Sequence, residues 1–188
     1  MGKLLIFAAP SGAGKTTIVR HLLGQFPQLA FSVSATTRNQ RPHEQDGRDY
    51  YFMDTDTFRQ KMAQGEFVEW EEVYEGQYYG TLRAEIERLW SEGRHVLFDV
   101  DVKGALRLKA AYPDQALAVF VKPPGPETIR QRLIARGTET PETLAKRMAR
   151  VAEELSYEPR FDQVLINDDL SRALAEAEAL VANQLAKP

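Results

Sequence analysis

Hydrophobic residues along the chain fall into short continuous runs, separated by longer stretches of helical character. Uninterrupted apolar runs of about five residues are typical of strands buried on both faces. The expected strands are Leu4–Ala8, His95–Asp99, Leu117–Val121 and Gln163–Ile166. The expected helices are Thr16–Leu23, Ala84–Trp90, Gly104–Ala111, Pro126–Ala135, Glu142–Leu155 and Leu170–Leu185. Because strands and helices alternate, the pattern predicts an α/β fold, in which helices flank a parallel sheet on both faces.

Residues 32–83 interrupt this alternation with short polar and aromatic segments. Alternating side chains in Tyr50–Met53 and Phe67–Trp70 indicate a small mixed or antiparallel sheet. We interpret residues 32–83 as an insertion that carries a second substrate. The charged stretch 136–157 is typical of a mobile lid. The expected organisation is therefore one domain, with a core of residues 1–31, 84–135 and 158–188.

Composition narrows the function classes. The chain has 188 residues, 43% of them hydrophobic, which fits one domain with a sizeable core. Its net charge of −3 argues against nucleic acid as a partner. No apolar run approaches the ~20 residues of a membrane span, and the N-terminus lacks a signal-peptide pattern. Cysteine is absent and the three histidines are scattered, which excludes disulfides and argues against a zinc site. We expect a cytoplasmic protein with no membrane partner.

A glycine-rich turn follows the first strand and precedes a helix. Glycines there let backbone N–H groups converge on phosphate oxygens, and the helix directs its positive end at the same anion. Lys15 would reach the β- and γ-phosphates, and the Thr16 hydroxyl would ligate Mg²⁺. The alternative is an ordinary strand–turn–helix. Ala9 stands where the usual pattern has glycine, which is tolerated if its φ stays negative. The expected phosphate-binding residues are Ala9, Pro10, Ser11, Gly12, Ala13, Gly14, Lys15, Thr16 and Thr17.

Residues that could bind a second phosphate lie early in the insertion. Arg38 and Arg41 follow a run of hydroxyl residues and could bind an anion through paired N–H donors. Tyr50 could donate its hydroxyl to the same phosphate. The alternatives are a solvated basic loop for the arginines and a hairpin turn at Asp46-Gly47, with aromatic core residues behind it.

Glu69 is a candidate for reading a base. A carboxylate can accept two parallel hydrogen bonds from the N1–H and N2–H₂ groups of guanine, a donor pair that no other common base presents. A buried carboxylate left unpaired by the wrong base would be costly, so one residue can give steep selectivity. The alternative is a strand residue that faces solvent.

Two further groups carry charges suited to phosphoryl transfer. Asp99 and Asp101 end a predicted central strand, where they could hold Mg²⁺, although a terminal aspartate also caps helices. Arg132 and Arg136 are four residues apart and would share a helix face, with Arg147 further on. Positioned arginines stabilise the charge that develops on a transferring phosphoryl group. The alternative is a solvated helix with ion pairs to Glu127 or Glu139.

Together these motifs resemble the guanylate kinase family, over about Leu4 to Leu170. The matching segments, in the family's order, are the phosphate loop, Ser34 to Arg38 with Arg41-Pro42, Gly47-x-Asp-Tyr50, Phe67-x-Glu69-Trp70, Gly76-x-x-Tyr79-Gly-Thr81, Asp99-x-Asp101-x-x-Gly104, Arg132-x-x-x-Arg136-Gly-Thr, Arg147 and Asn167-Asp168-Asp169.

The resemblance implies a phosphate-loop NTPase-type core, a GMP-binding insertion and a lid over ATP. It implies transfer of the γ-phosphoryl group of ATP to GMP, and to dGMP as well, in purine metabolism. It gives catalytic roles to Lys15, Arg38, Arg132, Arg136 and Arg147 and the metal to Thr16, Asp99 and Asp101. GMP would be held by Ser34, Arg38, Arg41, Tyr50, Glu69, Tyr79, Thr81 and Asp101, and Asn167 would lie near the adenine.

Two alternatives stay open at this stage. One is a kinase of a phosphorylated sugar such as ribose bisphosphate, which Glu69 and the tyrosine pair argue against. The other is a non-catalytic module of guanylate kinase type, which the intact phosphate loop argues against. Two departures from the family's pattern are Ala9 and Lys103, where the family more often has Gln. The sequence leaves the oligomeric state open.

Overall fold

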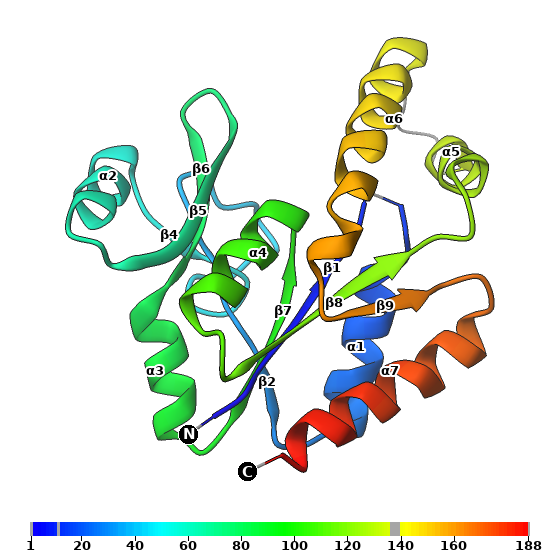
Figure 1. Cartoon of the computed structure of the whole chain (residues 1–188). Helices are drawn as coiled ribbons and strands as arrows, with labels where there is room; N and C mark the ends of the chain where they lie inside the picture. The colour runs from blue at the N-terminus through cyan, green and yellow to red at the C-terminus, as the bar shows by residue number, and fades with distance from the viewer. Residues whose placement is uncertain (1, 11, 136–139, 188) are drawn as a thin grey trace.

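The computed structural model of the chain describes residues 2–10, 12–135 and 140–187. Within them, five parallel strands form a central sheet in the order β2-β7-β1-β8-β9 (Figure 1). The four strands expected from the sequence are confirmed, and β2 is an additional edge strand. Their bounds are β1 Leu4–Ala8, β2 Leu29–Phe31, β7 His95–Val100, β8 Ala116–Lys122 and β9 Gln163–Ile166.

Helices cover both faces of this sheet, which explains why its strands are apolar throughout. Leu5 and Phe7 of β1 pack into the cluster that includes α1 (Lys15–Gln25) and α7 (Leu170–Leu185). Leu4 and Ile6 point to the other face, against α3 (Arg83–Ser91) and α4 (Val102–Ala111). All four side chains are fully buried. Strand alternation therefore divides one continuous apolar run between two hydrophobic clusters.

The insertion forms a second, mixed sheet in the order β4-β3-β6-β5, as the alternation predicted. The ring of Phe58 in α2 stacks on Phe67 and Tyr78, with centroids 4.3 and 5.4 Å away, and this aromatic group is the insertion's own core. Neither β3 nor α2 was expected. The bounds are β3 Ala35–Thr36, β4 Tyr51–Phe52, α2 Thr55–Ala63, β5 Phe67–Tyr74 and β6 Gln77–Leu82.

The predicted lid is largely one helix. α6 (Pro141–Ser156) begins with a capping box, in which the Thr140 and Thr143 side chains each accept from the other's backbone N–H. It packs on α5 (Pro126–Ala135) through Ile129 and Val151 and is followed by the short η1 (Glu158–Arg160). Residues 136–139 of the predicted lid lie outside the described part of the chain.

The insertion and α6 rise from the same end of the central sheet, where β1 and β7 end (Figure 1). Ligand sites of open parallel sheets lie at this carboxyl edge. Among the described residues, no helix combines the length and apolar character that crossing a membrane requires.

Candidate active site

The loop between β1 and α1 is shaped to hold an anion. Gly12 and Gly14 have φ values of 88° and 89°, which strain other residues. No described non-glycine residue has a positive φ, so Ala9 meets the condition expected of it. Gly14 precedes α1 without a side-chain cap, the Thr17 N–H donates to the Gly14 carbonyl oxygen at 3.2 Å, and the positive end of the helix dipole faces the loop. The predicted loop residue Ser11 lies outside the described residues.

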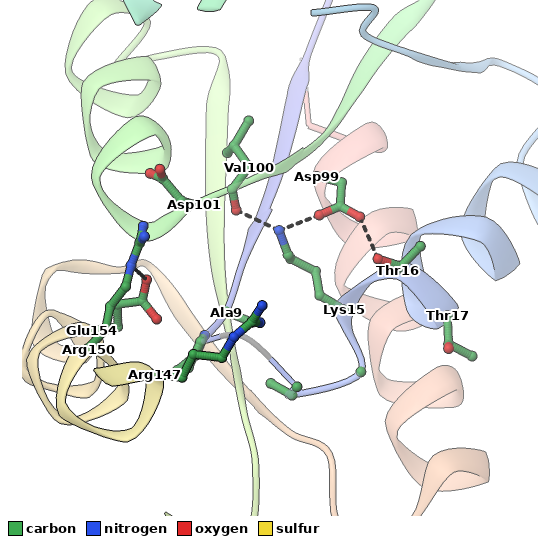
Figure 2. A pocket seen from close by; sticks show the side chains of 14 residues that line it. Ala9, Lys15, Thr16, Thr17, Asp99, Val100, Asp101, Arg147, Arg150 and Glu154 are labelled. Carbon is green, nitrogen blue, oxygen red and sulfur yellow. Dashed lines mark hydrogen bonds and ion pairs between the residues drawn. The ribbon is translucent and has the colours of Figure 1, made fainter. Parts of the chain in front are cut away.

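Lys15 and Thr16 both contact the end of β7. The Lys15 ammonium donates to the carbonyl oxygen of Val100 at 2.7 Å and forms an ion pair with Asp99. The Thr16 hydroxyl donates to the other Asp99 oxygen at 3.0 Å (Figure 2). Asp99, the last residue of the predicted strand, is thus joined to the phosphate loop by both side chains.

A cavity of about 500 Å³ opens above this loop. Arg147 and Arg150 of α6 point into it from the side opposite Lys15 (Figure 2). Arg147 was expected there, whereas Arg150 was not singled out as a site residue. Arg150 donates to Glu154 at 3.0 Å. The predicted Arg136 and the side chain of Arg132 lie outside the described part of the structure.

Asn167 is tied to the phosphate loop. Its side-chain amide is buried and donates to the carbonyl oxygen of Ala13 at 2.7 Å. Asn167 also borders a second hollow of about 460 Å³, together with Gly12, Thr17 and Leu170. The structure therefore places Asn167 beside the loop, where its amide holds the Ala13 carbonyl.

Glu69 and Thr81 form a buried pair in the insertion. The two residues lie opposite each other on β5 and β6, and the Thr81 hydroxyl donates to Glu69 Oε1 at 2.7 Å. Glu69 is only 8% exposed. Burial raises the pKa of its carboxyl, the Thr81 bond partly opposes this, and the charge of Asp101 raises the pKa further. The alternative of a strand residue that faces solvent is therefore wrong for Glu69.

Asp101 of the core lies close to the Glu69–Thr81 pair of the insertion. It caps α4 by accepting from the Gly104 N–H at 2.7 Å, so the alternative reading as a helix cap holds for Asp101 and not for Asp99. A Cβ at Gly104 would lie 3.0 Å from Glu69 Oε2 and 3.3 Å from Asp101 Oδ1. The missing side chain at Gly104 thus lets two carboxylates converge.

The predicted phosphate-binding residues of the insertion form an aromatic and basic group. Tyr50 and Tyr79 meet edge to face at 5.9 Å, and the Arg38 guanidinium lies 5.4 Å from the centre of the Tyr50 ring. Arg41 contributes an exposed side chain. Ser34, which the resemblance gives to the base rather than to the phosphate, is half-buried, and its carbonyl oxygen accepts from the Tyr51 N–H at 2.9 Å. The insertion therefore brings Arg38, Tyr50 and Tyr79 together.

Glu44 is a residue that the sequence analysis missed. Both terminal nitrogens of Arg38 donate to its carboxylate, at 3.1 and 2.8 Å, and the Arg41 backbone N–H donates at 2.8 Å. Arg38 first, and then Arg41, lower the pKa of Glu44 to about 2. In this structure Glu44 therefore accepts from the paired donors of Arg38, and the assignment of Arg38 to a phosphate stays a prediction.

Comparison with known proteins assigns the chain. The family model for guanylate kinase matches residues 1–184. The chain belongs to the guanylate kinase family. It is similar to the guanylate kinase of Bacteroides fragilis (50% identity, covering 93% of this chain and 86% of that one) and of Porphyromonas gingivalis (45%, both chains covered fully). The crystal structure of guanylate kinase from Anaplasma phagocytophilum superposes with a TM-score of 0.76 at 28% identity, covering 99% of this chain and 87% of that one.

Lys103, a departure from the pattern of the guanylate kinase family, turns away from the buried carboxylates. Its ammonium pairs with Glu153 of α6 at 3.0 Å, and both side chains are about half exposed. An exposed pair of this kind contributes about 0–1 kcal/mol. Lys103 therefore links the core weakly to the predicted lid and leaves the Glu69–Asp101 region unchanged.

Proposed function

We propose that the chain transfers the γ-phosphoryl group of ATP to GMP and releases ADP and GDP. The observation that carries the proposal is the turn at the end of β7, which borders two different subsites. Asp99 contacts Lys15 and Thr16 of the phosphate loop, and Asp101, two residues later, lies beside Glu69. A donor phosphate and an acceptor base would thus be held on either side of one short segment.

On the donor side, the phosphate loop would bind ATP. Loop N–H groups and Lys15 would hold the phosphates, and Asn167 would keep the loop in shape beside the adenine. Magnesium, when bound, supplies positive charge that the transferring phosphates need. The described residues hold no cluster of three or more His, Cys, Asp or Glu suited to a metal. Magnesium sites that use substrate phosphates need only one or two carboxylates, so Thr16 and Asp99 fit this ion. The cap formed by Asp101 makes it a poorer ligand than predicted.

On the acceptor side, Glu69 would accept from the N1–H and N2–H₂ groups of guanine. The Thr81 hydroxyl already donates to Glu69 Oε1 and so fixes the orientation of the carboxylate. Asp101 and Ser34 would complete the base site. Arg38, Arg41, Tyr50 and Tyr79 would bind the phosphate of GMP. A site that hydrogen-bonds its substrate in this way rejects analogues without the donors by about 10⁴–10⁵.

Transfer requires no protein nucleophile, because a phosphate oxygen of GMP attacks the γ-phosphorus of ATP in line. The chain's contribution is to align the two phosphates and to stabilise the charge on the transferring group. Lys15, Arg147 and the predicted Arg132 and Arg136 would supply that charge. Closure of α6 would exclude water, which otherwise would hydrolyse ATP.

The direct test is a coupled assay of ADP release with GMP, dGMP, AMP and UMP in parallel. We expect turnover with GMP and dGMP and none with AMP or UMP. Lys15→Ala tests the donor side separately and should lower turnover on the order of 10²–10³-fold, because it removes one charge-stabilising donor. Turnover only with a sugar phosphate, or no turnover at all, would support one of the two alternatives, which the family assignment does not favour.

The proposed reaction belongs to purine nucleotide metabolism. A cysteine-free chain is suited to the reducing cytoplasm, where ATP and GMP are both available. We propose no nucleic-acid or membrane partner, since both substrates are small molecules.

A further inference from the structure

The loop between β3 and β4 contains a buried carboxylate that the proposed mechanism does not use. Glu44 is 9% exposed, in a stretch whose neighbouring residues are largely exposed. Its carboxylate accepts three hydrogen bonds, from Arg38 Nη1, Arg38 Nη2 and the backbone N–H of Arg41. These donors come from the two arginines assigned to the phosphate of GMP.

The backbone around Glu44 closes the loop on itself. The Glu44 N–H donates to the carbonyl oxygen of Arg41 at 3.0 Å, and the Gln40 side chain donates to the carbonyl oxygen of Glu44 at 2.6 Å. Residues 38–44 thus form one hydrogen-bonded unit with the carboxylate at its centre.

Arg38 is restrained on its other side as well. Its guanidinium lies 5.4 Å from the centre of the Tyr50 ring and 5.7 Å from that of Phe52. The hydrogen bond to Glu44 is the largest cause that raises the pKa of Arg38, and burial opposes it. A bidentate pair and two aromatic rings leave this long side chain few alternative rotamers.

We propose that Glu44 is a positioning residue, which holds Arg38 and the Arg41 backbone in the arrangement that receives the phosphate of the acceptor nucleotide. The inference rests on the proposed function and adds a residue to its acceptor site. Glu44 does not touch the phosphate. It acts by ordering two cationic residues before the ligand arrives, so that binding does not have to restrict them.

Glu44 should influence the affinity for the ligand phosphate in two opposite ways, so the change in affinity when Glu44 is replaced tests the inference. As an anion close to a phosphate site, Glu44 repels the ligand, so a neutral residue in its place would strengthen binding if charge alone mattered. As a positioning group, its loss would weaken binding. Because Glu44 is already neutralised by Arg38 in a bidentate pair, we expect positioning to dominate.

The experiment compares Glu44→Gln with Glu66→Gln, which removes the same charge from another ion pair of the insertion, Lys61–Glu66 at 2.7 Å. Steady-state kinetics would give KM for GMP, KM for ATP and kcat, and calorimetry would give Kd for GMP and for guanosine. In Glu44→Gln, KM and Kd for GMP should rise about tenfold, as expected for one or two side chains that lose their order. KM for ATP, kcat and Kd for guanosine should change less than about twofold, as should all parameters of Glu66→Gln.

A double-mutant cycle with Arg38→Met identifies the route of the effect. If Glu44 acts through Arg38, adding Glu44→Gln to Arg38→Met should cost much less GMP affinity than it does alone. Unchanged or tighter GMP binding by Glu44→Gln would overturn the inference, as would equal losses of GMP and guanosine, which indicate a damaged insertion. A wild-type protein that does not use GMP would refute the proposed function instead, independently of these variants.

Discussion

Glu69 combines burial with a role that requires a charge. Its carboxyl is 8% exposed, and burial raises its pKa, with Asp101 adding to the rise and Thr81 and Arg107 opposing it. Only the ionised carboxylate can accept from both donors of guanine. The same burial that makes a mismatched base costly therefore makes guanine binding sensitive to acid.

Guanosine binding should therefore weaken as the pH falls, beginning above the range in which an ordinary glutamate titrates, because protonation of Glu69 removes one acceptor. Guanosine is the appropriate ligand, since the phosphate of GMP itself titrates near pH 6 and would confuse the profile. Calorimetric Kd values measured across pH would check this. Glu69→Gln should bind weakly at every pH, and Glu71→Gln, two residues further along β5, should retain the wild-type profile. A flat wild-type profile would contradict the role of Glu69.

At the scale of elements, Glu85 of α3 connects the insertion to the core. Its carboxylate is nearly inaccessible and accepts from the Val33 N–H at 3.2 Å, from the Tyr51 hydroxyl at 2.8 Å and from Arg88 at 3.0 Å. Burial first, and then the hydrogen bond to Glu85, raise the pKa of Tyr51. One side chain thus joins the connection before β3, the strand β4 and the helix α3.

Glu85→Gln should lower the free energy of unfolding by about 1–3 kcal/mol, because the neutral amide cannot satisfy three donors at once and leaves polar groups buried. Chemical denaturation measures the change. Glu92→Gln is the control, since Glu92 also pairs with Arg88 but is about half exposed, and it should stay within about 0.5 kcal/mol of wild type. Equal losses in the two variants would show that Glu85 acts only as a surface partner of Arg88.

The same elements show what sequence patterns can predict. The four central strands were predictable because burial on both faces requires continuous apolar residues. β2 has only three residues, ends on the half-exposed Phe31, and gives no comparable pattern. α2 was missed because Phe58 is its one fully buried side chain, so it lacks a helical stripe. Hydrophobic periodicity is strong where the core is large and weak in a small insertion.

Sequence motifs named candidate site residues but gave no indication of the contacts that support them. Motifs indicated Lys15, Glu69 and Asp99 as candidate site residues, because each stands in a motif whose chemistry suits the binding of a phosphate, a base or a metal ion. The hydrogen bond that Arg38 donates to Glu44 joins residues six apart in a loop, where no periodicity marks a partner. The sequence likewise allowed either Asp99 or Asp101 to cap the following helix, and only the hydrogen bond from the Gly104 N–H identifies Asp101 as the cap.

At the scale of the whole molecule, α6 faces the phosphate loop and packs on α5 through Ile129 and Val151. Arg147 points toward the loop and Arg150 toward Asp101 (Figure 2). Beyond α5, Leu155 and the exposed Lys103–Glu153 pair join the helix to the core. Exposed ion pairs contribute little and are screened by salt. The phosphates of a bound nucleotide would supply stronger contacts to the arginines, so the ligand would favour closure.

Small-angle scattering should therefore show a smaller radius of gyration when a bisubstrate analogue joining adenosine and guanosine is bound. Guanosine alone, which lacks phosphates, is the control and should leave α6 in place. Identical profiles with and without the analogue would argue against closure.

The central claim is that Glu69 selects guanine beside a loop that holds the donor phosphates, and a crystal structure with the same analogue tests it most directly. The account predicts that the Glu69 carboxylate accepts from guanine N1–H and N2–H₂ while the loop N–H groups and Lys15 contact the phosphates of the adenosine half. A guanine bound away from Glu69, or phosphates outside the loop, would contradict it.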